Sequence, residues 1–394
     1  MIDKELASTK RDLRKILTLN LEQGKFSGLK FFRSSSEKNE IDAAQDFPGL
    51  LQKVVNIEKR IYSKINCNLS AMDKNIPLAN QDAILKKIRN QIAILVGFNK
   101  VLTKKIPFFY TPEDTNMLSF HSLLKVHYKE LSLEKILQLN FDADIESVTI
   151  SNSITKQFLM KMLDTIMLSI LKANLSSEGQ YFLSRLAASL QQNEHDISLM
   201  LNYKSTSGSL EISPENMNAY AEGNDNLDEN ETLQDRVKDI KKNTGASSAL
   251  IIPVWPEHGC SLEQEYGVFF KDYNRLERSV ENLVGGSFSY DENENIFYTP
   301  FHLEIMHEFI HALHNSRGTN RELLSSMHQG EKKVWKDAEE YWTIKGANIS
   351  ENFLNKIVNA PPRYGHGGFS ASAILHPEDN QDLLIHSPLK LFNG

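Results

Sequence analysis

Residues 301–316 read FHLEIMHEFIHALHNS, and this stretch decides how the rest of the sequence is interpreted. His307 and His311 are four residues apart, so on a helix both side chains project from one face, one turn apart. Two imidazoles placed in this way can reach one metal ion at about 2.0–2.1 Å from each nitrogen. The opposite face is apolar and predicts a helix that is buried on that side: Leu303, Ile305, Phe309, Ile310 and Leu313.

Glu308 lies between the two histidines and leans toward the same side of the helix. In this HExxH spacing it can take a proton from a zinc-bound water and deliver that proton to a leaving amine. The competing interpretation is an ordinary pair of core or surface histidines. The apolar opposite face and the short strands expected just before the helix favour the zinc site. His302 and His314 are expected to lie off the metal-facing side, either exposed or orienting a ligand.

A catalytic zinc usually has three protein ligands, so a third one must be found. The extension with a third histidine six residues after the second is absent, because Arg317 occupies that position. The remaining pattern takes a glutamate from a second, later helix. Glu339 and Glu340 are the candidates, with Glu340 lying 29 residues after His311, and Glu331 is a weaker rival because two lysines follow it.

Together these segments resemble a known group of enzymes. HEFIHALH followed by EEYWTI resembles the HELxHxxH…EExxT signature of the NleD-like zinc effector proteases that pathogenic bacteria inject into host cells. It is more distantly similar to the light chains of clostridial neurotoxins. The resemblance covers about residues 285–370 and implies that Glu340 is the third ligand, while Glu339 orients a ligand histidine. Residues 349–354 are similar to the ISENxL part of the effector pattern, with Asn355 where an arginine is usual.

The resemblance also implies two residues that act on the transition state. The enzymes carry Arg-x-x-Tyr or Arg-x-x-His near the zinc, which corresponds here to Arg363 and His366. A cation or hydrogen-bond donor aimed at the attacked carbonyl oxygen would stabilise its developing negative charge. Tyr364 is the alternative donor to His366, and a surface arginine in a Pro/Gly-rich loop is the alternative interpretation of Arg363.

The first half of the sequence predicts helices, which we interpret as a helical domain over residues 1–205 that binds a substrate or partner or acts as a scaffold. Apolar residues recur there at steps of three and four. The stretches with this pattern are Leu50–Ile65, Asp82–Leu102, Ser122–Leu139, Thr155–Leu175 and Tyr181–Leu190.

Residues 206–232 are rich in Ser, Asn, Gly, Asp and Glu, which predicts a linker or exposed loop. Residues 233–394 are expected to form a zincin-like catalytic domain, with strands at Ser248–Trp255, Phe288–Tyr290 and Ile296–Tyr298 and a helix at Val268–Val284. The expected fold class is therefore α+β, a zincin-like metallopeptidase domain preceded by a mainly α-helical domain.

The composition of the sequence limits which partners the protein can be expected to bind and in which cellular compartment it can be expected to work. A net charge of -7, with 40% apolar and 24% charged residues, is that of a globular protein and gives no reason to expect nucleic-acid binding. Two cysteines without a Cys-x-x-Cys pair exclude a structural zinc finger and indicate a reducing compartment. The N-terminus lacks a basic segment followed by an apolar one, so no cleaved Sec signal is expected. We expect a soluble monomer without membrane insertion.

These observations lead to one expected function and two alternatives. The expected function is a zinc-dependent endopeptidase that hydrolyses a host protein. The resemblance implies a bacterial effector that leaves the bacterial cytoplasm without a cleaved Sec signal and acts in the host cytoplasm. The alternatives are a metal-dependent hydrolase of a non-peptide substrate and a binding or scaffold effector whose zinc site is vestigial.

Overall fold

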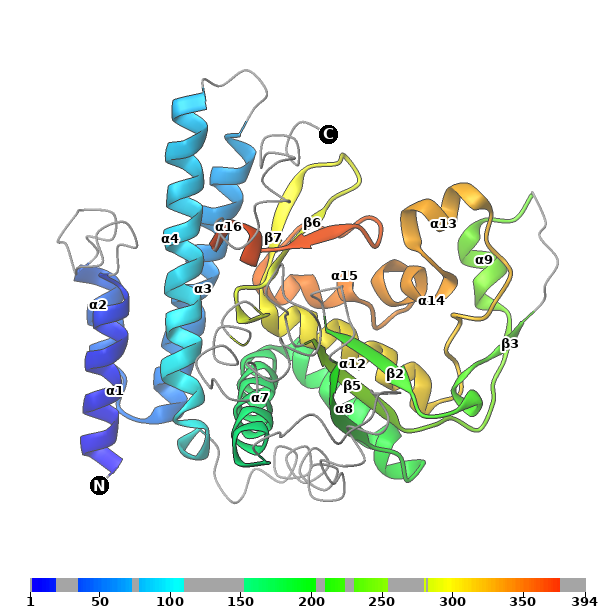
Figure 1. The fold of residues 1–394 in the computed structure, drawn as a ribbon, viewed down its shortest axis with the longest axis horizontal. Coiled ribbons are helices and arrows are strands. Elements are labelled where there is room, and N and C mark those ends of the chain that lie inside the picture. Colours follow the sequence, from blue (N-terminus) through cyan, green and yellow to red (C-terminus); the bar gives the residue numbers. More distant parts are fainter. Residues whose placement is uncertain are drawn as a thin grey trace.

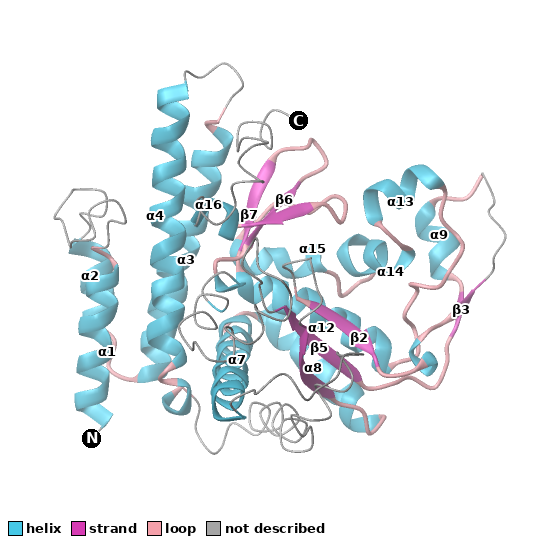
Figure 2. Cartoon of the chain, in the orientation of Figure 1, coloured by secondary structure: helices cyan, strands magenta, loops and turns pink. Residues whose placement is uncertain are grey.

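A computed structural model describes residues 2–18, 35–72, 78–109, 152–202, 210–223, 230–253, 280 and 283–375. This part of the chain combines many helices with three small sheets, so its class is α+β, as expected (Figures 1 and 2). The helix expected at residues 122–139 lies outside the described residues, as does nearly all of the helix expected at 268–284. None of the helices within the described ranges is long and apolar enough to cross a membrane.

The described part of the first half is helical up to residue 192, as its apolar periodicity predicts. Helix α3 illustrates the cause, since the residues spaced by three and four on its inner face are all nearly inaccessible: Leu50, Val54, Ile57, Ile61 and Ile65. The Asp46 carboxylate caps its first turn by accepting the backbone N–H of Gly49 at 2.7 Å. The elements are α1 (Ile2–Ile16), α2 (Ser35–Asp42), α3 (Phe47–Ser70), α4 (Leu78–Thr103), η3 (Ile106–Phe108), α7 (Asn152–Ala173) and α8 (Ser177–Gln192).

The first sheet joins strands from both sides of the expected linker. Its order is β1-β5-β2, from β1 (Ile197–Asn202), β5 (Ser248–Pro253) and β2 (Glu211–Pro214). Strand β1 runs parallel to β5, with Ile197 opposite Ser248, and β2 runs antiparallel to β5, with Ile212 opposite Leu250. The expected boundary at residue 205 therefore falls between two strands that pair with the same neighbour. The division into residues 1–205 and 233–394 stays a prediction.

The segment expected as a linker or loop contains β2, and part of it is buried. Ala219 is fully inaccessible, and the backbones of Ala219 and Ala221 hydrogen-bond with that of Asn320 just after the metal-motif helix. The elements between β2 and β5 are η5 (Met217–Ala219), β3 (Glu222–Gly223), α9 (Leu233–Lys238) and β4 (Ile240–Lys241). Strands β3 and β4 pair antiparallel as a separate two-stranded sheet.

The third sheet has the order β7-β6-β8, from β6 (Ser287–Tyr290), β7 (Ile296–Thr299) and β8 (Gly368–Ser370). β6 and β7 form the expected hairpin, whose turn is stabilised by the Asp291 carboxylate, an acceptor of the backbone N–H groups of Asn293 and Asn295. β8 arrives from the C-terminal end of the described chain and pairs with the other side of β6. Its pairing returns the preceding loop toward the centre of the molecule.

Helix α12 (Phe301–Ser316) is the element around which the rest is arranged (Figure 1). It packs against α7 and α8 of the first half and against β2 and β5 of the first sheet. Leu303, Ile305 and Phe309, expected on its apolar face, are at most 1% exposed. One hydrophobic core contains these residues together with the inner faces of α3, α4, α7 and α8. The motif helix is thus held by residues from both halves of the sequence.

Short helices follow α12 in the sequence (Figure 1). They are α13 (Gln329–Trp335), α14 (Ala338–Tyr341), the π-helical turn η6 (Trp342–Gly346), α15 (Glu351–Leu354), η7 (Asn355–Val358) and α16 (Ser372–Leu375). A second, smaller apolar cluster, which includes Val237, Trp335 and Tyr341, supports α13 and α14.

Candidate metal centre

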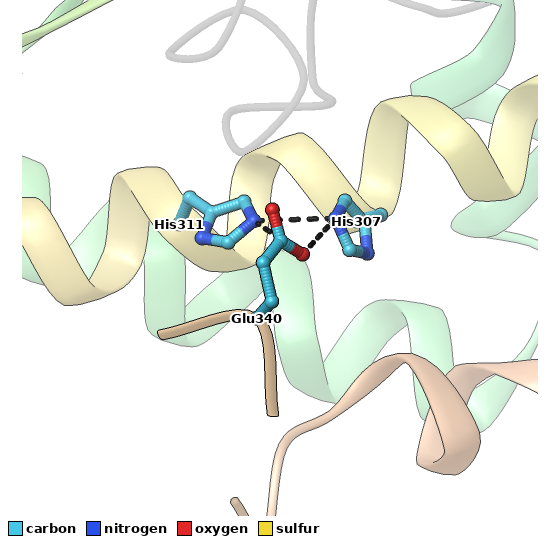
Figure 3. Close-up of side chains that lie close together, drawn as sticks. All are labelled: His307, His311 and Glu340. Carbon is cyan, nitrogen blue, oxygen red and sulfur yellow. Dashed lines mark hydrogen bonds and ion pairs between the residues drawn. The ribbon is translucent and has the colours of Figure 1, made fainter. Parts of the chain in front are cut away.

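Three side chains from α12 and α14 converge on one point (Figure 3). The Nε2 atoms of His307 and His311 are 3.2 Å apart, and Glu340 Oε2 lies 3.4 Å from the first and 3.7 Å from the second. All three side chains are buried, and their ligand atoms lie within 4.8 Å of one another. This cluster could hold a metal ion. The sequence-derived choice of His307, His311 and Glu340 is the set that the structure brings together.

The short helix α14 aims Glu340 at the histidines. Asp337 caps the helix, because its Oδ1 accepts the backbone N–H of Glu340 at 2.9 Å. Glu339 and Glu340 are adjacent and both buried, at 2% and 7% exposure, yet they point to different partners. Glu340 faces both Nε2 atoms, whereas Glu339 contacts the far side of the His311 ring.

Carboxylates hold the outer nitrogens of both histidines. His307 Nδ1 donates to Glu351 Oε2 at 2.8 Å, and His311 Nδ1 donates to Glu339 Oε1 at 3.0 Å. His314, one turn later, donates to the same Glu339 oxygen at 2.6 Å. A carboxylate can only accept, so in the neutral rings of His307 and His311 the proton sits on Nδ1 and the Nε2 lone pair faces the cluster. That tautomer is the one a metal requires.

Glu339 is itself fixed on every side. Its Oε2 accepts the backbone N–H of Arg321 at 2.9 Å, and the Thr343 hydroxyl donates to its Oε1 at 3.2 Å. Although burial raises the pKa of Glu339, its charged and hydrogen-bonded partners His314 and His311 outweigh burial and hold the pKa well below its usual range. Glu339 is therefore a permanent anion that orients His311, which is the role that the resemblance implied for it.

The cluster also has a distinctive electrostatic state. Burial lowers the pKa of His307, but the neighbouring carboxylates of Glu340 and Glu351 outweigh burial and raise that pKa to about 9. The pKa of His311 is raised well above its usual value because Glu340 and Glu339 overcome burial in the same way. Burial raises the pKa of Glu340, yet both histidines overcome this and hold it well below its usual range. Without a metal the pocket thus attracts protons, and a metal must displace them.

A metal ion fits this donor set. Glu340 Oε2 is buried and has no hydrogen-bond partner among the described residues, which is costly for a carboxylate oxygen. Two imidazole nitrogens and one carboxylate oxygen are also ligands that zinc accepts, with a position left open. A cation would satisfy the unpaired oxygen and both lone pairs at once.

Glu308 lies beside the cluster without belonging to it. Its Oε1 is 4.0 Å from His307 Nε2, and its side chain is 12% exposed. Strand β2 packs against the helix that carries it. Burial raises the pKa of Glu308, although the neighbouring histidines oppose that effect. A carboxylate poised in this way suits a group that accepts and releases a proton.

Arg363 reaches the site from the loop before β8, but it is engaged with the protein. Its Nη1 donates to Glu351 Oε2 at 2.9 Å, its Nε to the Gly365 carbonyl at 3.1 Å, and its Nη2 to the His366 carbonyl at 2.6 Å. The side chain is only 13% exposed. Burial raises the pKa of Glu351, but Arg363 and His307 overcome this and lower it to about 2. In this structure Arg363 holds Glu351, which in turn holds His307.

His366 is the residue of this loop that faces the cluster. Its Nε2 lies 3.4 Å from Glu340 Oε1, and its side chain is 42% exposed. Gly365 makes the approach possible: its φ is +86°, and a Cβ there would be 2.9 Å from the carbonyl oxygen of Val334. Tyr364, the alternative donor, packs its ring on Trp335 with centroids 5.1 Å apart.

Glu331, the rival third ligand, is used elsewhere. It forms an ion pair with Arg236 at 2.5 Å and accepts the backbone N–H of His328 at 2.8 Å, which caps α13. The residue that the sequence did not single out is Glu351. It lies in the segment similar to the effector pattern and directly follows Ser350, the N-cap of α15, so its signal was an acidic first turn in a short helix.

Searches against protein-family models, curated proteins and solved structures found no match to this chain.

Proposed function

We propose that this chain is a zinc-dependent endopeptidase with a zincin-like catalytic region, in which His307, His311 and Glu340 hold the zinc. The observation that carries the proposal is the convergence of these three buried side chains, with Glu340 Oε2 left without a hydrogen bond. Zinc bound there would polarise a substrate carbonyl and acidify a water molecule. Neighbouring residues would transfer protons and donate hydrogen bonds to the substrate.

Glu308 is the proposed general base and acid. It lies next to the cluster but is not among the three converging ligands, so its carboxylate is free to accept a proton from water. The same group would then deliver that proton to the amine leaving from the cleaved bond. His366, which faces Glu340 from the other loop, is placed to donate a hydrogen bond to the substrate.

Strand β2 supports a peptide as the substrate. It lies at the edge of its sheet among the described strands, and it packs against α12, the helix that carries Glu308. An extended peptide that paired along this edge would lie beside Glu308. The source and target of the enzyme follow from the sequence resemblance: a secreted bacterial effector, similar to the NleD-like group, that cleaves a host protein.

Replacing Glu308 tests the chemistry directly. Glu308→Gln should retain about one zinc per chain while losing at least 100-fold in turnover, because it removes proton transfer and leaves the ligands intact. Wild type and Glu308→Gln would be compared by elemental analysis and by mapping new N-termini in a eukaryotic cell lysate. Glu292→Gln, in the exposed β6–β7 turn, is the matched control and should behave as wild type.

Two results would reject the proposal in different ways. Purified wild-type protein without stoichiometric zinc would point to a scaffold with a vestigial site. Zinc-loaded protein that hydrolyses small esters or amides but produces no new N-termini would point to a non-peptide hydrolase.

A further inference from the structure

The proposed centre needs a positive charge that can contact the substrate. The Arg363 guanidinium is not well placed to provide it, because it is already hydrogen-bonded to the protein. Its Nε, Nη1 and Nη2 each donate to a protein oxygen, and one of those oxygens belongs to Glu351, which orients His307. Turning Arg363 toward a substrate would break these bonds and release the support of a ligand histidine. The structure offers another cation closer to the converging ligands.

That cation is Lys336, between α13 and α14. Its Nζ lies 3.7 Å from Glu340 Oε1, and its side chain is 54% exposed. Glu340 turns Oε2 toward the histidines, so Oε1 is the outward oxygen, and His366 approaches the same atom at 3.4 Å. Lys336 and His366 therefore flank the third ligand on its open side, and the lysine remains accessible to a substrate.

The backbone at Lys336 is strained in a way that fixes its direction. Its φ and ψ are 70° and -64°, and the Asp337 N–H donates to the Trp335 carbonyl at 2.9 Å. This is the rare γ-turn with a positive φ, which costs a non-glycine residue on the order of 1–3 kcal/mol. Buried Trp335 on one side and the capping residue Asp337 on the other hold the turn in place. The strained residue is thus the one whose ammonium reaches the third ligand, four positions later in the chain.

We propose that Lys336 is a catalytic residue of this centre: its ammonium meets the negative charge that develops on the substrate carbonyl oxygen. This inference rests on the proposed function and assigns to Lys336 the charge that the sequence pattern gave to Arg363. A lysine ammonium is a compact point charge on a flexible stem, so it can shift from Glu340 Oε1 to a nearby substrate oxygen without dismantling the site. Removing such a donor typically costs about 10²–10³ in turnover.

Acetate binding to the cobalt-substituted protein tests the charge without requiring turnover. The visible spectrum of cobalt in the site reports when an anion enters. Lys336→Met, which keeps the apolar stem, should weaken acetate binding about tenfold while leaving cobalt and zinc stoichiometry unchanged. Lys336→Arg should recover most of the affinity. Lys333→Met makes the same charge change at an exposed position on α13 and should match wild type.

Lys336→Gly separates the charge from the turn. Glycine adopts a positive φ without strain, so this variant should melt at or above the wild-type temperature and still lose acetate affinity as Lys336→Met does. On a cleaved protein substrate, both variants should lose about 10²–10³ in kcat with a much smaller change in KM. Wild-type acetate affinity and kcat in Lys336→Met and Lys336→Gly would overturn the inference. If the wild-type protein binds cobalt and acetate but cleaves no protein, the proposed function is wrong, and the acetate affinities of the variants still test the role of Lys336. If cobalt does not bind, both the proposed function and this inference are wrong.

Discussion

Two buried polar clusters lie along α12, and they differ in whether their atoms are all partnered. Near its start, Lys172 Nζ donates to Glu58 Oε1 at 2.7 Å and to Asn99 Oδ1 at 3.0 Å, while the Tyr62 hydroxyl donates to Glu58 Oε2 at 3.3 Å. We call these four residues the helix-side cluster. Tyr62 connects it to α12, since its ring centroid lies 6.3 Å from that of His302.

The candidate metal site, formed by His307, His311 and Glu340, is also buried, but not all of its polar atoms have hydrogen-bond partners. Each nitrogen and oxygen of the helix-side cluster has a partner, whereas Glu340 Oε2 has none among the described residues. A buried carboxylate oxygen without a hydrogen bond is costly, and here it lies beside two imidazole nitrogens in a set that could hold a metal ion. The comparison shows that burial and charge do not by themselves identify a site. The informative feature is donor atoms that converge and remain unsatisfied.

Removing the Glu340 carboxylate should have the largest effect on the metal site. Glu340→Ala should reduce bound zinc from about one per chain to almost none in equimolar metal, because a ligand bond is lost. Glu339→Ala removes only the partner of His311 and should weaken zinc affinity about 10–100-fold. Competition with a colorimetric chelator measures both. Equal zinc affinity in the two variants would contradict the assignment of the third ligand.

Substitutions in the helix-side cluster should instead change the free energy of unfolding. Lys172→Met leaves the Glu58 carboxylate buried without its cation, which should lower the free energy of unfolding by about 3–5 kcal/mol. Adding Glu58→Leu should restore most of the loss, since the pair is then replaced by apolar side chains. Urea denaturation measures both variants.

Lys241 and Glu222 provide the control for this experiment. They form an ion pair at 2.6 Å, nearly the same distance as Lys172 and Glu58, but both side chains are more than two-thirds exposed. Lys241→Met should hardly change the unfolding midpoint, because solvent screens an exposed pair. A loss as large as that of Lys172→Met would show that burial does not set the cost.

His302 should affect stability less than Lys172 does, and its effect should depend on pH. Burial, and then the charges of Lys172 and Lys59, lower its pKa from 6.5 to about 3. Unfolded chains would protonate this histidine below pH 6.5 while the fold would not, so its contribution to stability is present above pH 6.5 and is lost as the pH falls toward 3. At pH 5 the loss is about 2 kcal/mol.

His302→Phe should remove that dependence. Its unfolding free energy should fall less between pH 7 and pH 5 than that of wild type, whatever the constant offset between the two proteins. Parallel curves would show that the ionisation of His302 does not govern the acid sensitivity.

The sequence predicted those features that depend on local spacing. Helix α3 and the face of α12 follow from apolar residues three and four apart, and His307 and His311 from a single helical turn. The partners at longer range could not be predicted from spacing. Glu351 lies 44 residues from His307, and the strand pairing of Ile197 with Ser248 crosses a segment of loop-like composition. Such pairs are chosen by how the whole core packs.

Arg363 illustrates the same limit at one residue. Its position near the site was predicted, but the direction of its guanidinium depends on Glu351 and on two carbonyls of its own loop. For Lys336, the sequence predicted no role, and the structure places the residue beside Glu340. Nothing in its local composition indicates a positive φ, because the strain is imposed by the buried residue before it and the capping residue after it.

Because α12 packs between the two halves, a metal ion bound to its histidines would link metal binding to the folding of both halves. A ligand that binds only the folded chain stabilises everything that must be folded for the site to exist. Helices α7 and α8 pack against the helix that carries the histidines and share one hydrophobic core with it. A bound zinc ion would therefore also stabilise helices that do not contact it. Conversely, a substitution that destabilises the core around Lys172 would reduce the fraction of chains able to retain the ion.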